Sequence, residues 1–191
     1  MMKNLYIVSG CNGAGKTTAS YTVLPEILEC REFVNADEIA RGLSPFNAEG
    51  VAIEAGKLML QRIEELLKED VTFAIETTLA TRSYVNLVKR AQSQGYRVSL
   101  LYFWLNSPEL AMRRVAERVS KGGHGIPEVI IRRRYTAGIN NLFKLFMPAV
   151  DYWAIFDNSA TPRRIVATGG RKSETVTMEE ELLRTIRAYV K

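Results

Sequence analysis

Apolar residues are concentrated in five short runs, which are separated by longer stretches with helical spacing of apolar positions. The runs contain few polar residues, as is typical of strands buried on both faces of a sheet. They span residues 5–10, 32–37, 72–78, 97–105 and 152–158.

Helical patterns fill most of the segments between these runs. Apolar residues recur every four positions from Val51 to Leu67 and predict a helix over about 45–69. Further helices are expected at 83–95, from Pro108 to about 120, and from Pro127 to about 146. Strands that alternate with helices indicate a single α/β domain over 1–191, with a five-stranded parallel sheet and helices on both faces.

The pattern changes after about residue 160. A Gly-Gly pair stands between two strand-like runs within 163–177, which predicts a small hairpin. The segment from about 179 to 190 then has the spacing of a closing helix.

The first predicted strand leads directly into SGCNGAGKTT, residues 9–18, which matches G-x-x-x-x-G-K-T at every fixed position. A strand, a glycine-rich loop and a helix in this order form a P-loop, whose backbone N–H groups surround phosphate oxygens. Lys16 is expected to bridge the β- and γ-phosphates of ATP, and Thr17 to ligate Mg²⁺. The predicted cofactor-binding residues are Gly10, Cys11, Asn12, Gly13, Ala14, Gly15, Lys16, Thr17 and Thr18.

Several classes of P-loop protein are excluded by motifs that the sequence lacks. It has neither the N/T-K-x-D motif with which switch proteins read guanine nor the L-S-G-G-Q signature of transport cassettes. It also lacks a long insert of the kind found in oligomeric motors. A short chain with arginines late in the sheet is typical of small-molecule kinases, which have a nucleotide-kinase-like P-loop fold.

Composition limits the expected cellular location and the expected partners of the protein. Cys11 and Cys30 are the two cysteines, which is too few for a disulfide scaffold, so we expect free thiols and a cytoplasmic location. No signal peptide and no apolar run of membrane-spanning length is recognised, so no membrane partner is expected. The formal net charge is +5, but the basic residues are scattered, so a nucleic-acid partner is not favoured.

Two acidic residues are predicted at strand ends, where ligands bind in such sheets. Asp37 closes the second strand and is the candidate base for the acceptor hydroxyl, although it also suits a helix N-cap. Glu76 closes the third strand and is expected to bind substrate or to support Mg²⁺. Thr77 and Thr78 add hydroxyl groups at the same place.

An arginine-bearing lid is predicted over about 113–135, where two Pro-initiated helices flank the loop KGGHGIP. Arg118 and Arg134 are the first candidates for contacts to the transferring phosphoryl group, followed by Arg132, a candidate for substrate binding, and Arg113. At least half of the six arginines on these helices are expected to lie on solvated faces. His124 is either a phosphate ligand in the lid or an ordinary loop residue.

Four blocks in this order resemble the zeta toxin-like kinases, in particular their short bacterial branch often labelled predicted ATPases. The blocks are LYIVSGCNGAGKTT, FVNADEIARGLSPFN, FAIETTLATRSY and RVAERVSKGGHGIPEVIIRRRY, and the likeness covers about residues 5–160. The resemblance implies a P-loop kinase fold, ATP·Mg²⁺ as donor, and catalytic roles for Lys16, Asp37, Arg118 and a second lid arginine. It also implies a small-molecule acceptor such as the sugar of UDP-N-acetylglucosamine, phosphorylated at its 3′-hydroxyl.

The chain departs from that family pattern in its shorter length, in His124 near the place of an expected lid arginine, and in its C-terminal hairpin. These differences bear on the acceptor more than on the chemistry. The resemblance also admits an antitoxin partner, which one chain does not identify. Two alternatives to a small-molecule kinase stay open: an ATPase that acts on a partner, and a kinase of polynucleotide ends.

Overall fold

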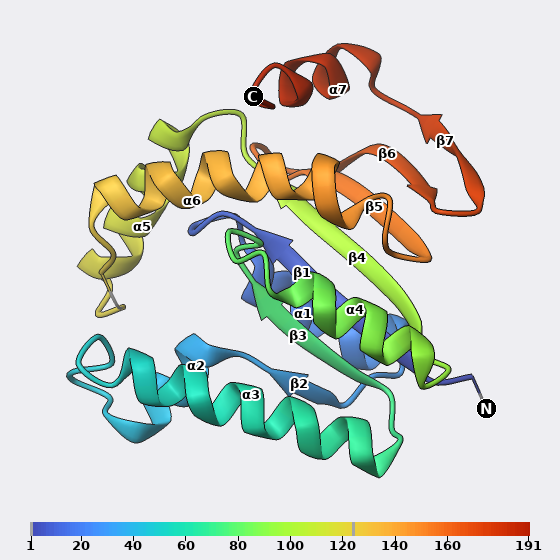
Figure 1. Ribbon diagram of the computed structural model, residues 1–191. Helices are drawn as coiled ribbons and strands as arrows, with labels where there is room; N and C mark the ends of the chain where they lie inside the picture. The colour runs from blue at the N-terminus through green and yellow to red at the C-terminus, as the bar shows by residue number, and fades with distance from the viewer. Residues whose placement is uncertain (1, 124) are drawn as a thin grey trace.

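A computed structural model describes residues 2–123 and 125–191, and its elements follow one another as strands and helices around one sheet (Figure 1). The strands are β1 (Asn4–Gly10), β2 (Glu32–Val34), β3 (Phe73–Thr77), β4 (Arg97–Trp104), β5 (Tyr152–Asp157), β6 (Arg164–Gly170) and β7 (Ser173–Thr177). The α-helices are α1 (Lys16–Thr22), α2 (Ala36–Leu43), α3 (Ala52–Glu69), α4 (Tyr84–Ser93), α5 (Pro108–Ser120), α6 (Glu128–Asn141) and α7 (Glu180–Arg187). Two π-helical turns, η1 (Val23–Ile27) and η2 (Leu142–Phe146), extend α1 and α6.

The sheet has the strand order β2-β3-β1-β4-β5-β6-β7. Its first five strands are parallel, and β1 is central, with Ile7 opposite Ile75 of β3 and Leu100 of β4. All three of these side chains are fully buried, as their positions in nearly unbroken apolar runs predict. The parallel core places the carboxyl ends of β1, β2 and β3 side by side.

The expectation of five strands is wrong in number, because the sheet has seven. The predicted hairpin forms, as β6 and β7, but it is not a separate feature: β6 pairs antiparallel with β5 and extends the sheet. The hairpin thereby covers the edge that β5 would otherwise expose. In Figure 1 the hairpin and α7 lie together at the C-terminal side of the molecule.

The predicted helix over 45–69 is also wrong at its start. The structure has two helices, α2 and α3, and the segment between them is not helical. Ser44 has an extended backbone at the end of α2, next to Pro45, whose ring disfavours a helical conformation in the residue before it. The helices predicted from Pro108 and Pro127 begin as expected, with Pro127 as the N-cap of α6.

The position predicted for Asp37 needs a correction of the same kind. Strand β2 ends at Val34, so Asp37 does not close it but lies in the first turn of α2. The N-cap is Asn35, whose side-chain oxygen accepts a hydrogen bond from the Asp37 backbone N–H at 2.8 Å. None of the helices within the described residues has the length and apolar character required to cross a membrane.

Candidate active site

The P-loop joins β1 to α1, which begins at Lys16. Gly13 and Gly15 have φ values of 78° and 77°, a left-handed conformation that glycine adopts without strain. Gly15 is the N-cap of α1, so the loop ends at the N-terminus of the helix. The backbone N–H groups of the loop therefore lie next to the positive end of the helix dipole.

Gly10 and Gly13 of the P-loop also allow close packing behind the loop. A Cβ at Gly10 would overlap the backbone carbonyl of Phe103 in β4, and one at Gly13 would lie 2.8 Å from the carbonyl oxygen of Ala111 in α5. The Asn158 side-chain amide, just after β5, donates a hydrogen bond to the Ala14 carbonyl at 2.8 Å. The loop is therefore fixed against three elements of the fold.

Lys16, Thr17 and Glu76 meet at the carboxyl ends of β1 and β3. The Thr17 hydroxyl donates to a carboxylate oxygen of Glu76 at 2.8 Å, and the Lys16 Nζ lies 3.6 Å from the other oxygen. Lys16 also donates to the Cys11 carbonyl at 3.0 Å, and its side chain is only 7% exposed. The lysine thus folds back onto the loop that is expected to bind phosphate.

Burial raises the pKa of Glu76, and the nearby Asp37 carboxylate raises it further, while Lys16 and Thr17 act in the opposite direction. Glu76 and Asp37 line the same cleft. Burial also raises the pKa of the Cys11 thiol to about 11, so this free cysteine is protonated at neutral pH.

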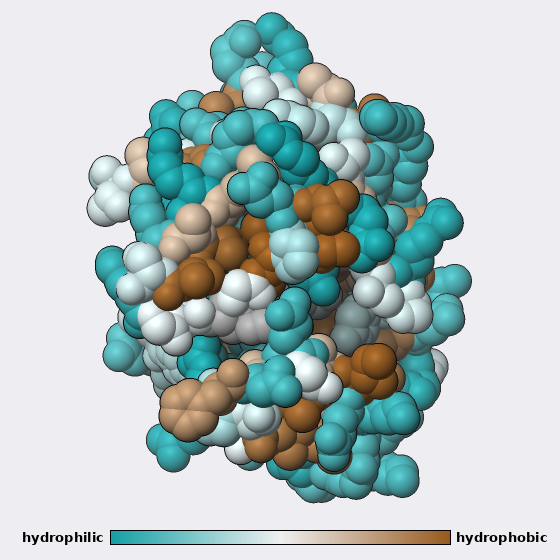
Figure 2. All heavy atoms as spheres, turned by 90° about the vertical axis from the view of Figure 1, so that its left-hand side faces the viewer, coloured by the Kyte–Doolittle hydropathy of each residue, from teal (hydrophilic) through white to brown (hydrophobic). Residues whose placement is uncertain are grey.

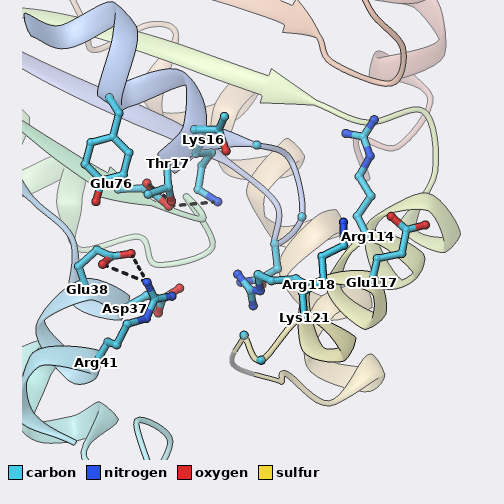
Figure 3. Close-up of a pocket in the computed structure, with 17 residues that line it drawn as sticks. Lys16, Thr17, Asp37, Glu38, Arg41, Glu76, Arg114, Glu117, Arg118 and Lys121 are labelled. Atoms are coloured by element: carbon cyan, nitrogen blue, oxygen red, sulfur yellow. Dashed lines mark hydrogen bonds and ion pairs between the residues drawn. The ribbon is translucent and has the colours of Figure 1, made fainter. Parts of the chain in front are cut away.

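A cleft of about 970 Å³ opens in front of these residues. The P-loop and Glu76 form its base, Asp37, Glu38 and Arg41 of α2 form one wall, and α5 with the turn after it forms the other. Figure 3 shows the α2 side chains on one side of this space and those of α5 on the other. Figure 2 views the molecule from the side where α5 and the α2–α3 connection lie, with hydrophilic residues around a mixed, hollowed centre.

The structure brings only some of the predicted lid arginines to this cleft. Arg118 lines it, and Arg134 reaches the P-loop, where it donates to the Asn12 side-chain oxygen at 3.3 Å. Arg132 was expected to bind substrate but does not line the cleft, because it pairs with Glu109 at 2.7 Å on an exposed surface. Arg113 is exposed and outside the cleft lining.

Thr77 and Thr78 are likewise absent from the cleft lining, in contrast to their prediction. The Thr77 hydroxyl accepts a hydrogen bond from the Leu79 backbone N–H at 3.1 Å, and the Thr78 carbonyl packs against Gly138 of α6. Both residues therefore shape the loop after β3. Thr18 lines the cleft, whereas Cys11 is buried beneath the loop, and His124 lies outside the described residues.

Sequence reasoning missed several residues of the cleft. Arg114 lines it and donates to the Asn158 and Ser159 carbonyls at 2.9 and 3.0 Å, so it joins α5 to the end of β5. The other cleft residues not predicted as site residues are Tyr21, Glu38, Arg41, Glu117, Lys121, Gly122 and Gly123. Their helical spacing could have revealed them, since Tyr21 follows Thr17 by four residues, and Arg41 follows Asp37 by four.

The residues at the base of the cleft suit Mg²⁺. Thr17 and Glu76 offer a hydroxyl and a carboxylate, hard oxygen ligands of the type that Mg²⁺ prefers, already in contact with each other. Within the described part of the chain, no three His, Cys, Asp or Glu side chains form a metal-binding group. Such a site therefore depends on oxygens of the nucleotide, as is usual for Mg²⁺ bound with a phosphate substrate.

Comparison with known proteins agrees with this arrangement. The model of the family described as Zeta toxin matches residues 2–163. An uncharacterised protein of Haemophilus influenzae (strain ATCC 51907 / DSM 11121 / KW20 / Rd) is 30% identical over 135 residues, which cover 71% of this chain and 94% of that protein.

Solved structures from two systems have the same fold at low sequence identity. The AvrRxo1-ORF1:AvrRxo1-ORF2 complex, solved with sulphate ions and with ATP, gives TM-scores of 0.77 and 0.76 at 17% identity. The match covers 97% of this chain but 63% of that one, so this chain spans less than two thirds of its relative. The PezAT chromosomal toxin–antitoxin system of Streptococcus pneumoniae gives a TM-score of 0.67 at 17% identity, over 99% of this chain and 78% of that one.

The family match extends over most of the chain and includes the P-loop, Glu76, α2 and α5. It supports an ATP-dependent phosphotransferase activity in general terms, and the fold is that of a P-loop kinase with two added antiparallel strands. The family resemblance found in the sequence is thereby confirmed. The chain belongs to the zeta toxin family.

Proposed function

We propose that this protein transfers the γ-phosphoryl group of ATP to a hydroxyl of a small molecule, with a nucleotide sugar such as UDP-N-acetylglucosamine as the first candidate acceptor. One observation carries the proposal. A single cleft has the P-loop and Glu76 at its base, the Asp37 carboxylate on one wall and the Arg118 guanidinium group on the other. This is a donor site, a candidate base and a source of positive charge around one space.

The P-loop side holds the donor in this proposal. Loop N–H groups surround the β-phosphate, and the Lys16 ammonium moves from the Cys11 carbonyl and Glu76 to the β- and γ-phosphate oxygens. Bound Mg²⁺, held by Thr17 and supported by Glu76, would neutralise charge on these phosphates.

The acceptor enters from the α2 side. Its hydroxyl gives its proton to the Asp37 carboxylate as its oxygen forms a bond to the γ-phosphorus, while the bond from that phosphorus to the β-phosphate oxygen breaks and ADP leaves. Asp37 suits this role because it lies in the first turn of α2 and its side chain faces the cleft. Arg118 stabilises the charge on the phosphoryl group in transit, and Arg134 stabilises the loop through Asn12.

A mass-spectrometric transfer assay tests this proposal. The protein is incubated with ATP and Mg²⁺ and, separately, with nucleotide sugars, nucleosides, simple sugars and oligonucleotides. We expect one nucleotide sugar to gain the mass of one phosphoryl group. ATP hydrolysis without a phosphorylated acceptor would instead support an ATPase that acts on a partner, and labelling of oligonucleotide ends would support a polynucleotide kinase.

An antitoxin is a further proposed partner, since the Streptococcus pneumoniae relative comes from a toxin–antitoxin system. Cytoplasmic expression of the wild-type chain and of its Lys16→Ala variant tests this idea. Growth arrest by the wild type alone, relieved by a neighbouring gene product, is the expected result. Equal growth with both chains would contradict a toxic activity.

A further inference from the structure

A second hollow of about 520 Å³ lies between α6 and the loop that connects β3 to α4. Its rim carries Arg82 from the loop, Arg133 from α6, Lys144 from η2, and Lys191. Small and aliphatic side chains such as Ala137 form part of its floor. None of these residues belongs to the lining of the P-loop cleft.

The side-chain charges in this hollow are of one sign. Four of its described lining residues are cationic and none is acidic, whereas the P-loop cleft sets four carboxylates among its five cations. Among the described residues, Arg82 and Arg133 form no salt bridge, and Lys144 donates to the Lys191 carbonyl. The charges of Arg82 and Arg133 are therefore not compensated by a carboxylate side chain, and a bound anion would compensate them.

The hollow is built by fixed contacts. The buried Asn141 amide of α6 donates to the Leu79 and Ala80 carbonyls at 2.9 and 3.1 Å, and so holds the loop against the helix. Gly138 allows this close approach, because a Cβ there would lie 2.7 Å from the Thr78 carbonyl oxygen. Leu79 has a φ of 61°, a strained conformation for a residue with a side chain, which turns the loop back toward α6.

The same two elements also carry residues of the P-loop cleft. Strand β3 ends with Glu76 and Thr77, and the loop that follows it leads to Arg82. On α6, Arg134 contacts the P-loop while the adjacent Arg133 lies in the hollow. A ligand that extends from the cleft along this loop would therefore meet Arg82 and Arg133.

We propose that this hollow binds a phosphate group, and that Arg82 and Arg133 are its main ligands. Guanidinium groups pair with two phosphate oxygens at once, and Thr136 adds a neutral hydroxyl group at the same wall. The phosphate comes either from the acceptor, at a distance from the hydroxyl that reacts, or from a separate anion. The first source rests on the proposed kinase function, whereas the binding of phosphate does not.

Calorimetry with inorganic pyrophosphate tests the site without any need for catalysis. The donor part of the P-loop cleft is first saturated with a non-hydrolysable ATP analogue and Mg²⁺, so that pyrophosphate does not compete for the P-loop. We expect the wild type to bind one further pyrophosphate, and Arg82→Gln and Arg133→Gln each to weaken it by about tenfold or more. Arg31→Gln is the matched control, since this substitution removes the same charge. Arg31 is exposed just before β2 and does not line the hollow.

Kinetics then distinguish the two sources. If the phosphate belongs to the acceptor, Arg133→Gln raises KM for a nucleotide sugar by about tenfold with kcat nearly unchanged, and leaves KM for the phosphate-free sugar unaltered. If the anion is separate, pyrophosphate affinity falls and neither KM changes. The proposal is overturned if the saturated wild type binds no pyrophosphate, or if the two hollow variants bind it as the Arg31→Gln control does.

Discussion

Lys16 and Glu76 occupy one nearly dry corner of the cleft, with side chains that are 7% and 8% exposed. Each compensates part of the charge of the other, so the corner is stable before a nucleotide binds. In the proposed mechanism the lysine gains stronger partners when phosphate binds, and Glu76 is left with Thr17. The functions of single residues at this site should therefore separate into donor binding and chemistry.

Replacement of Lys16 and of Asp37 should separate these two functions. Lys16→Ala removes a charged donor to phosphate, and we expect it to weaken ATP binding about ten- to a hundredfold and to abolish transfer. Asp37→Asn keeps the side-chain shape but removes the base, and should lower kcat by about 10²- to 10⁴-fold while ATP binding stays nearly constant. Calorimetric titration with an ATP analogue and initial rates measure both effects.

Glu38→Gln is the matched control, since Glu38 is the next residue of the same helix and lines the same cleft. Its kcat should remain within a few-fold of the wild-type value. Asp37→Asn with normal kcat would remove Asp37 from its role as base.

The raised pKa of Glu76 predicts a particular dependence of stability on pH. The folded protein holds this proton more tightly than the unfolded chain, because burial disfavours the carboxylate. The free energy of unfolding should therefore fall as pH rises from the ordinary glutamate value through the raised pKa, and recover as pH is lowered. In thermal unfolding without ligand, the Tm of the wild type should rise relative to that of Glu76→Gln as pH falls from 7 toward 5. A constant difference would show that burial does not control this carboxyl.

At the scale of elements, the contact between α6 and the loop after β3 fixes the position of the P-loop cleft relative to the second hollow. Gly138 and Asn141 lie one helical turn apart and both face that loop. The glycine permits the approach, and the asparagine satisfies carbonyl groups that the turn leaves open.

A pair of glycine substitutions tests this contact. Gly138→Ala places a Cβ 2.7 Å from the Thr78 carbonyl oxygen and should destabilise the fold by about 1–3 kcal/mol. Gly56→Ala, within α3 and without any atom within 4 Å of the added Cβ, should be neutral or stabilising by up to about 1 kcal/mol. Chemical denaturation measures both changes, and equal effects of the two substitutions would contradict the account of the α6 contact.

The sequence predicted the strands with continuous apolar runs and the helices that begin at a proline. The prediction failed where the boundary of an element depends on contacts with other residues. β1, β4, β5, α5 and α6 lie where the pattern placed them. Asp37 was misplaced because the strand–helix boundary follows from the cap at Asn35, which periodicity does not reveal. The position of Arg132 could not be predicted, because its partner Glu109 lies 23 positions away on another helix, a pairing that only the tertiary structure defines.

At the scale of the whole molecule, the cleft lies between two parts of the chain that are distant in sequence, α2 and α5. The predicted lid over 113–135 is one of these parts, and ligand binding should couple it to the P-loop. The seven-stranded sheet forms the common base of the two walls.

Hydrogen exchange tests the lid prediction. Addition of an ATP analogue with Mg²⁺ should slow amide exchange in peptides from the 113–135 segment, because Arg118 and its neighbours gain phosphate contacts. Peptides from the exposed face of α3 should change little and serve as the internal control. Unchanged exchange throughout 113–135, with the nucleotide bound, would contradict the assignment of this segment as a lid.

The packing behind the P-loop has a consequence for how this family evolves. Gly10 admits the backbone of β4 and Gly13 that of α5, so both glycines are required by the fold whether or not phosphate is ever bound. A descendant that lost its catalytic activity would remain under selection to keep them. In such a lineage, decay of Lys16 and Asp37 would be the earlier sign of lost activity, and the glycine pattern alone would record only common ancestry.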